Sequence, residues 1–160
     1  MPSPKLKLIN INLVITDYIK PLASSFESVT IEIDNIIKNA LIMADEKQIR
    51  QACSNLIKNS YENITLNKIL NGKISISIGA ENHFAFIIIS DNGTGIDKSI
   101  ISKILEPYYT TKVGNSGLGL AITKKIIDDH NGIILIKPLK GSKGMSVILK
   151  FPLITLFMRF

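Results

Sequence analysis

Hydrophobic and polar residues recur along the chain with two periods, one typical of β-strands and one typical of helices. Val29, Ile31 and Ile33 alternate with polar residues, which predicts a strand with one buried face. A further short strand is expected near 40–43. A hairpin is expected from strands at 74–78 and 84–89, and two more strands, 133–136 and 146–151, should flank a turn at 140–144.

Apolar residues at helical spacing mark the segments between these strands. A first helix is expected to follow Asn12, which we assign as its N-cap, although Pro21 interrupts the pattern. A second, longer helix is expected after Asp45, because Gln48 three residues later completes a capping-box-like pair. The inner face of this second helix is predicted to hold Ile49, Ala52, Cys53, Leu56, Ile57 and Ser60.

A third helix is expected over about 117–130, with Gly132 as its C-terminal cap. The preceding loop, 91–116, is rich in glycine and threonine and contains a short helical segment near 98–105. Strands on one side and helices on the other predict an α/β (α+β) two-layer sandwich, a mixed sheet covered on one face by about three helices.

Composition agrees with one ordinary globular domain. The chain has 160 residues, of which 46% are hydrophobic, and a domain of this size buries about 70% of the surface of its unfolded chain. Its single cysteine, Cys53, excludes an internal disulfide and has no second cysteine or histidine at metal-ligand spacing. We therefore expect a buried thiol in a reducing, cytoplasmic compartment.

The net charge of +6 raises nucleic acid as a possible partner. The lysines are scattered singly, however, with no run of five or six, so we expect a solvated surface and no nucleic-acid partner. No stretch of about 18 consecutive apolar residues is present, so no membrane span is predicted.

The segment 91–96, DNGTGI, directly follows an apolar strand. Asp91 stands at the strand end, and two glycines give the backbone after it unusual freedom. A carboxylate beside such a backbone suits recognition of the polar edge of a ring. On its own, the same pattern is also typical of a tight turn after a strand.

The segment 114–121, GNSGLGLA, leads into the third predicted helix. Unpaired N–H groups at such a helix start can bind phosphate. The segment is not a dinucleotide-binding fingerprint, because no strand directly precedes it and no βαβ unit follows. Alone, it is a weak signal.

Three amide side chains, Gln51, Asn55 and Asn59, lie one turn apart on the second predicted helix. Polar amides on an otherwise apolar face need partners. Bound Mg²⁺, phosphate oxygens and ordered water would supply them, and so would buried backbone groups. Only the order and spacing of all three features decide between these interpretations.

Taken together, these segments resemble the nucleotide-binding domain of sensor histidine kinases, in the GHKL superfamily of ATPases with a Bergerat-type sheet. The resemblance covers nearly the whole chain. It rests on 55–60 (NLIKNS) as the N box, 91–96 as the first glycine box, 105–112 (LEPYYTTK) as the F box and 117–120 (GLGL) as the second glycine box. The segments most similar to the NtrY-type nitrogen-sensing kinases are 1–6, 112–117 and 128–132.

This resemblance implies a site for ATP and Mg²⁺ that acts by positioning and electrostatics. Asn59 would hold Mg²⁺ with Asn55 in support, and Gln51 would assist phosphoryl transfer. Asp91 would accept a hydrogen bond from the adenine amino group. The remaining implied binding residues are Gly93, Gly95 and Ile96 near the base, Lys112 as a countercharge, and Gly117, Leu118, Gly119 and Leu120 near the phosphates.

The chain departs from the family pattern at three positions. Tyr108 stands where phenylalanine is commoner, Ser60 where the family prefers alanine, and Asn131 where it prefers glycine. None of these changes is expected to abolish nucleotide binding.

A complete kinase of this type carries a phosphoacceptor histidine in a helical hairpin before the nucleotide domain. We expect neither histidine of this chain to replace it: His83 falls at the surface of a strand hairpin, and His130 at a helix end where a cation would meet the dipole favourably. The expected partners are a dimerisation domain with the acceptor histidine, in cis or in trans, and a response regulator. An inner-membrane anchor in a full-length parent sensor is compatible with this scheme.

We therefore expect the end of the preceding dimerisation hairpin or a linker at 1–11, an ATP-binding catalytic domain at 12–153 and an apolar C-terminal tail at 154–160. The leading hypothesis is the catalytic domain of an ATP-dependent protein-histidine kinase. Two alternatives stay open, a nucleotide-binding interaction module and an inactive truncated kinase fragment, both without phosphoryl transfer.

Overall fold

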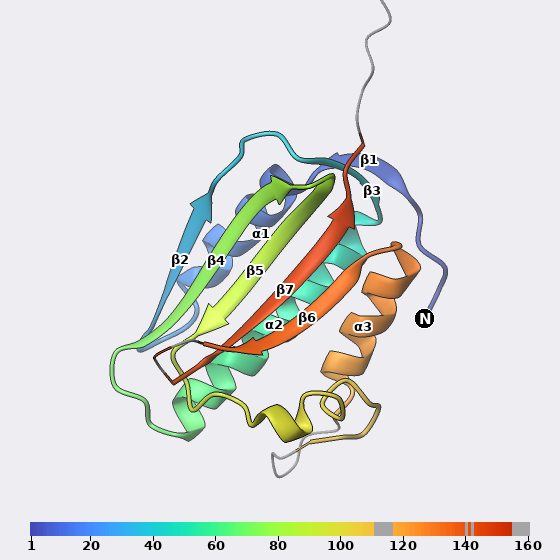
Figure 1. The fold of residues 1–160 in the computed structure, drawn as a ribbon. Helices are drawn as coiled ribbons and strands as arrows, with labels where there is room; N and C mark the ends of the chain where they lie inside the picture. The colour runs from blue at the N-terminus through green and yellow to red at the C-terminus, as the bar shows by residue number, and fades with distance from the viewer. Residues whose placement is uncertain (111–116, 140, 142, 155–160) are drawn as a thin grey trace, which may run out of the picture.

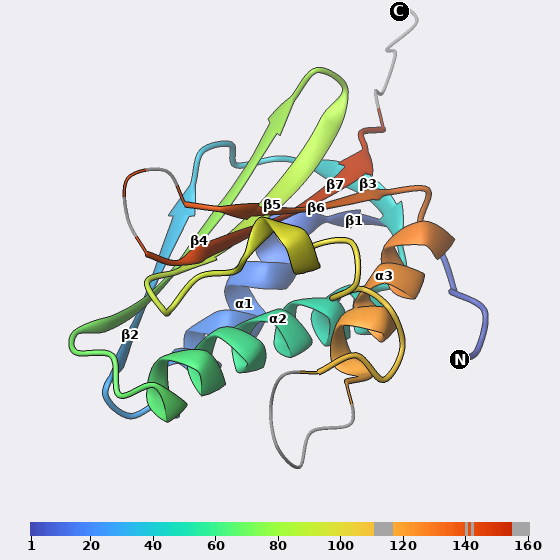
Figure 2. The same ribbon diagram turned by 60° about the horizontal axis from the view of Figure 1, so that its bottom comes forward.

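The structure, a computed structural model, describes residues 1–110, 117–139, 141 and 143–154. Its elements form two layers, a twisted sheet and a layer of helices (Figures 1 and 2). In chain order they are β1 (Lys7–Asn10), α1 (Ile11–Ala23), β2 (Val29–Asn35), β3 (Leu41–Ala44), α2 (Glu46–Leu66), β4 (Gly72–Glu81), β5 (Phe84–Asp91), the 3₁₀ helix η1 (Lys98–Ile100), α3 (Gly119–Asp129), β6 (Ile133–Pro138) and β7 (Met145–Pro152).

The main sheet has the strand order β2-β4-β5-β7-β6. β2 runs parallel to β4, and the other neighbouring strands are antiparallel. β1 and β3 form a separate antiparallel pair, with Leu8 opposite Met43. The predicted mixed sheet, with α1, α2 and α3 on one face, is thereby confirmed (Figure 2).

The core lies between the helices and the inner face of the sheet. All six residues predicted for the inner face of α2 are buried. Burial raises the pKa of the Cys53 thiol to about 12, so this thiol stays protonated and packs as a core residue. Among the described residues, no helix is long and apolar enough to cross a membrane.

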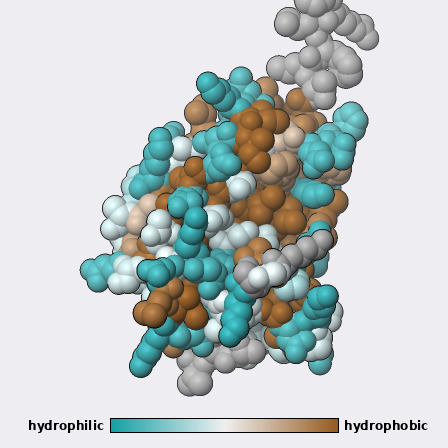
Figure 3. All heavy atoms as spheres, turned by 60° about the vertical axis from the view of Figure 1, so that its left-hand side comes forward, coloured by the Kyte–Doolittle hydropathy of each residue, from teal (hydrophilic) through white to brown (hydrophobic). Residues whose placement is uncertain are grey.

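The sheet face opposite the helices keeps half-buried apolar side chains, among them Phe84, Phe86 and Ile88 of β5. The space-filling view shows hydrophobic residues interspersed with hydrophilic ones over the surface it presents (Figure 3). The sheet therefore has one fully buried face and one mixed face, as its alternating strands require.

The start of α1 differs from the prediction. Asn10, not Asn12, is the N-cap, and its side chain accepts from the Asn12 backbone N–H at 3.1 Å. Asn12 is instead buried within the helix, where its Oδ1 accepts from Ala40 N at 3.2 Å and its amide donates to Ile37 O. Because the Asn12 side chain is hydrogen-bonded to the β2–β3 connection, it is not available to cap α1. Residues 7–11 form β1 and open α1.

Asp45 caps α2 as predicted, accepting from the backbone N–H groups of Lys47 and Gln48. The reciprocal half of the capping box is not formed, because the Gln48 amide donates to Pro2 O at 3.1 Å. The Asp45 N–H instead donates to Nε2 of His130 at 2.9 Å.

His130 is buried, and its Nδ1 lies 2.7 Å from Ile126 O. The ring therefore connects the backbone at the start of α2 to the backbone of α3. His130 lies at the end of α3 as predicted, and His83 is exposed at the β4–β5 hairpin as predicted.

Two other boundaries differ. The helical segment predicted near 98–105 is only the 3₁₀ turn Lys98–Ile100, and α3 begins at Gly119 rather than Gly117. The predicted turn at 140–144 lies partly outside the described residues, since positions 140 and 142 are among those not described.

Candidate functional site

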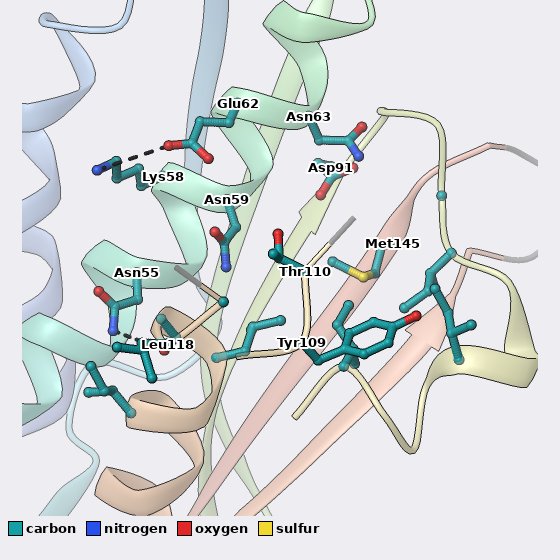
Figure 4. Close-up of a pocket in the computed structure, with 18 of the residues that line it drawn as sticks. Asn55, Lys58, Asn59, Glu62, Asn63, Asp91, Tyr109, Thr110, Leu118 and Met145 are labelled. Atoms are coloured by element: carbon teal, nitrogen blue, oxygen red, sulfur yellow. Dashed lines mark hydrogen bonds and ion pairs between the residues drawn. The ribbon is translucent and has the colours of Figure 1, made fainter. Parts of the chain in front are cut away.

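A cavity of about 450 Å³ lies between α2, the end of β5, the segment 95–110 and the start of α3 (Figure 4). This volume is within the range of sites that hold small molecules. α2 forms one wall together with Asp91 at the end of β5. The other wall consists of the segment 96–110 and residues 117–122. We call the first surface the α2 wall and the second the loop wall.

The α2 wall carries a row of amide side chains at helical spacing, Asn55, Asn59 and Asn63 (Figure 4). Asn59 lies in the middle of the row and lines the cavity. Asn55 turns toward α3, where its Nδ2 donates to Gly119 O at 3.1 Å and to Thr123 Oγ1 at 3.4 Å. Asn55 therefore joins the two walls through direct hydrogen bonds.

Asp91 ends β5 with its side chain at the cavity and only 4% of its surface exposed. Its Oδ2 accepts from Ser60 Oγ at 2.8 Å, and its Oδ1 accepts from Gly93 N at 2.9 Å. Ile96 and Met145 line the cavity as well. The arrangement is a buried, oriented carboxylate beside apolar side chains.

The loop that follows Asp91 rests on α2 through Asn63. The Asn63 Oδ1 accepts from Thr94 N at 3.0 Å, which fixes the loop backbone. A Cβ at Gly93 would collide with Asn63 Oδ1, so the close approach requires glycine. Asn63 was missed in the sequence, although it continues the four-residue spacing of Asn55 and Asn59.

The loop wall brings the F box against the second glycine box. Gly117 has φ +70°, and a Cβ there would lie 2.6 Å from Tyr109 O. Tyr109 and Thr110 line the cavity, while Tyr108 is exposed. The described ends of these two segments therefore touch. Lys112, predicted as a countercharge, lies outside the described residues.

The start of α3 opens onto the cavity. Its N-cap residue, Leu118, makes no side-chain capping hydrogen bond, and the first turn holds no acidic residue. Gly117, Leu118, Gly119 and Leu120 all line the cavity. An 11-residue helix with an uncapped N-terminus offers backbone N–H groups and a positive dipole end to an anion.

Charged side chains also border the cavity. Lys58 and Glu62 of α2 lie one turn apart, with Lys58 Nζ 4.0 Å from Glu62 Oε1, and sequence reasoning missed both. On the loop wall, Asp97 caps η1, and the Ser99 N–H holds the pKa of its carboxyl below the usual value.

Within the described residues, no three His, Cys, Asp or Glu side chains cluster as a metal site. A metal here would need amide oxygens and the oxygens of a bound anion, a donor set that suits Mg²⁺.

Most of the predicted site residues meet in this cavity. Asn55, Asn59, Asp91, Gly95, Ile96 and the four residues 117–120 line it. Gly93 lies behind Asp91 in the supporting loop, and Gln51 is exposed on α2 and does not line the cavity.

Comparison with known proteins gives a consistent answer. Residues 44–155 match the family described as histidine kinase-, DNA gyrase B- and HSP90-like ATPase. Sporulation kinase B of Bacillus subtilis (strain 168) is 37% identical over 129 residues, 81% of this chain and 29% of that protein. A putative sensor histidine kinase of Rickettsia conorii, NtrY-like, is 29% identical over 153 residues, 96% of this chain and 25% of that protein. The chain thus spans little more than a quarter of each relative.

Among solved structures, the nucleotide-free catalytic domain of the histidine kinase ThkA superposes with a TM-score of 0.81 at 26% identity, covering 92% of this chain and 95% of that one. A second structure holds ThkA in complex with the response regulator protein TrrA. It has a TM-score of 0.77 at 24% identity and covers 93% of this chain and 42% of that one.

Proposed function

We propose that this chain transfers the γ-phosphoryl group of ATP to a histidine of a dimerisation domain. The premise is that the chain belongs to the histidine kinase-, DNA gyrase B- and HSP90-like ATPase family and carries the ATP-binding catalytic domain of histidine kinases. The observation that supports this most is the polarity of the cavity. A buried carboxylate, Asp91, lies among apolar side chains at one end, and the uncapped start of α3 lies at the other. The carboxylate suits a nucleotide base that donates a hydrogen bond through an amino group, and the helix start suits phosphates.

Asn59 would hold Mg²⁺ between these two ends. It lines the cavity from the middle of α2, and its amide oxygen is a ligand type that Mg²⁺ accepts. When bound, the ion would neutralise phosphate charge and orient the γ-phosphoryl group. Asn55 would act indirectly, because its bonds to Gly119 and Thr123 keep α3 beside Asn59.

In the proposed transfer, an imidazole nitrogen of the acceptor forms a bond to the γ-phosphorus while the bond from phosphorus to the β–γ bridging oxygen breaks. ADP leaves with the bonding electron pair, and the proton on the other ring nitrogen of the imidazole passes to solvent water. Gln51 is exposed one turn before Asn55, so it would be accessible to an incoming histidine and could assist it there.

We propose as partners a dimerisation domain carrying the acceptor histidine, in cis or in trans, and a response regulator. The complex of ThkA with TrrA supports the second partner by analogy with that kinase. Similarity to an NtrY-like kinase over 96% of the chain favours the nitrogen-sensing subgroup.

The nucleotide site is tested by thermal unfolding with and without Mg-ADP. ADP at about 100 times its dissociation constant should add about 2.7 kcal/mol to the unfolding free energy, a shift of several degrees for a chain of this size. Asn59→Ala and Asp91→Ala should both lose the shift. Asp34→Ala, on the exposed face of the edge strand β2, is the matched control and should keep it. A folded wild type without any shift contradicts the proposal.

Phosphoryl transfer is tested separately, by adding the dimerisation domain of an NtrY-like relative and γ-labelled ATP. Acid-labile, base-stable label on that domain is the expected result. Wild-type nucleotide affinity without any phosphohistidine would favour the interaction module instead.

A further inference from the structure

Ser60 connects α2 to the carboxylate at the base end of the cavity. Its Oγ donates to Asp91 Oδ2 at 2.8 Å, and both residues are 96% buried. Ser60 immediately follows Asn59, the residue proposed to hold Mg²⁺. Consecutive residues of one helix therefore serve the middle of the cavity and its base end, although Ser60 itself does not line it.

The contact fixes the direction of the Asp91 carboxylate. Gly93 N donates to Oδ1 at 2.9 Å and Ser60 Oγ donates to Oδ2. The carboxylate is therefore hydrogen-bonded to the loop through one oxygen and to α2 through the other. A hydrogen bond to a buried carboxylate is stronger than one between neutral groups, and losing it leaves the charge poorly compensated. Each carboxylate oxygen can accept more than one hydrogen bond, so this arrangement is compatible with a further donor from a ligand.

We propose that Ser60 is a positioning residue that sets the preference of this site for adenine over a purine without an exocyclic amino group. This inference rests on the proposed function, because it requires Asp91 to accept from the base. The hydrogen bond from Ser60 orients Asp91 and so strengthens its contact with the adenine amino group, while the phosphate contacts are unchanged.

A second serine pair provides a matched control. Ser90, the residue before Asp91, shares a hydroxyl–hydroxyl hydrogen bond of 2.9 Å with Ser146 of β7. Because side chains alternate along β5, Ser90 points to the opposite face of the sheet from Asp91. Ser90→Ala therefore removes one hydroxyl bond beside Asp91 without touching the carboxylate.

The test is calorimetric titration of the full chain with ADP and with purine riboside 5′-diphosphate, which lacks the amino group, in the presence of Mg²⁺. Ser60→Ala should weaken ADP binding about tenfold, the effect of losing one hydrogen bond to a charged group. It should change binding of the analogue less than about twofold, and Ser90→Ala should change neither.

Each other outcome has a distinct meaning. If Ser60→Ala weakens both nucleotides by the same factor, Ser60 supports the site only structurally and the proposal is wrong. If it weakens neither, or if the wild type binds both equally well, Ser60 sets no preference for adenine. If the wild type binds neither nucleotide, the proposed function fails first, and this proposal fails with it.

Discussion

The two walls of the cavity are held by different kinds of interaction. On the α2 wall, side-chain hydrogen bonds join distant elements, as in the buried pair Ser60 and Asp91 or the exposed pair Asn63 and Thr94. Fully buried isoleucines such as Ile57 lie behind them. On the loop wall, the described residues 96–110 are half-buried or exposed. Backbone hydrogen bonds within this segment are local, such as Lys103 N to Ile100 O.

This difference in how the two walls are held indicates that they contribute differently to ligand binding. A wall fixed by the core keeps its binding geometry without a ligand, so its contacts cost little ordering entropy when the ligand binds. A wall fixed by local turns opens at low free energy and adjusts to what it binds. We infer that the α2 wall selects the nucleotide and that the loop wall responds to it.

The largest effect should come from removing core side chains behind each wall. Ile57→Ala, at a fully buried position of α2, should lower the unfolding free energy by about 2–5 kcal/mol. Ile104→Ala, at a half-buried position of the loop wall, should lower it by less than about 1.5 kcal/mol, because less apolar surface is re-exposed. Urea unfolding of both variants measures the two values. Equal losses would break the distinction between the walls.

Two glycine-to-alanine exchanges, one in the loop wall and one in the loop that rests on α2, should separate effects on affinity from effects on stability. In Gly117→Ala, the new Cβ strains a φ of +70° and meets Tyr109 O, so the loop wall should shift and ADP affinity fall about tenfold. Its unfolding free energy should fall by about 1–2 kcal/mol, the cost of placing an alanine in the left-handed region.

Gly93→Ala is the counterpart in the loop that rests on α2. Its Cβ displaces Asn63 Oδ1 from Thr94, so stability should fall by about 1–2 kcal/mol. ADP titration combined with urea unfolding separates the two signatures. Loss of stability in Gly117→Ala, with unchanged affinity, would reverse our assignment of roles.

The smallest effect should come from the charge at the start of α2. The Lys5 backbone N–H, with those of Gln48 and Lys47, holds the pKa of Asp45 below its ordinary value of 3.8. Asp45→Asn keeps a capping side chain and removes only the charge, so at pH 7 it should cost about 0.5–1 kcal/mol.

The pH dependence gives the sign of this effect. A lowered pKa in the folded state contributes stability above pH 3.8 and loses it as the pH falls toward the folded value. The difference between wild type and Asp45→Asn should therefore shrink below pH 3.8, in urea unfolding at pH 7 and pH 3. A difference that grows on acidification would contradict the assignment, and ADP affinity at pH 7 should be the same in both proteins.

Predictions from local pattern succeeded where the cause was local. The alternation of Ile74, Ile76 and Ile78 predicted a strand with one buried face, and those three side chains are fully or almost fully buried. Asp45 caps α2 because its partners are the next two or three residues. Predictions failed where the partner was remote: Asn12 accepts from Ala40, 28 residues away, and Gln48 donates to Pro2.

The site divides in the same way. The sequence by itself determined the residue types of the nucleotide-site motifs and their order, and from these the family followed, because side-chain chemistry and spacing along one helix or loop are local properties. The cross-links had to come from tertiary structure: Ser60 to Asp91 and Asn63 to Thr94, each 31 residues apart, and Asn55 to Gly119, 64 apart. Burial and direction arise only when α2, β5 and α3 pack together, and they make a polar residue into a positioned one.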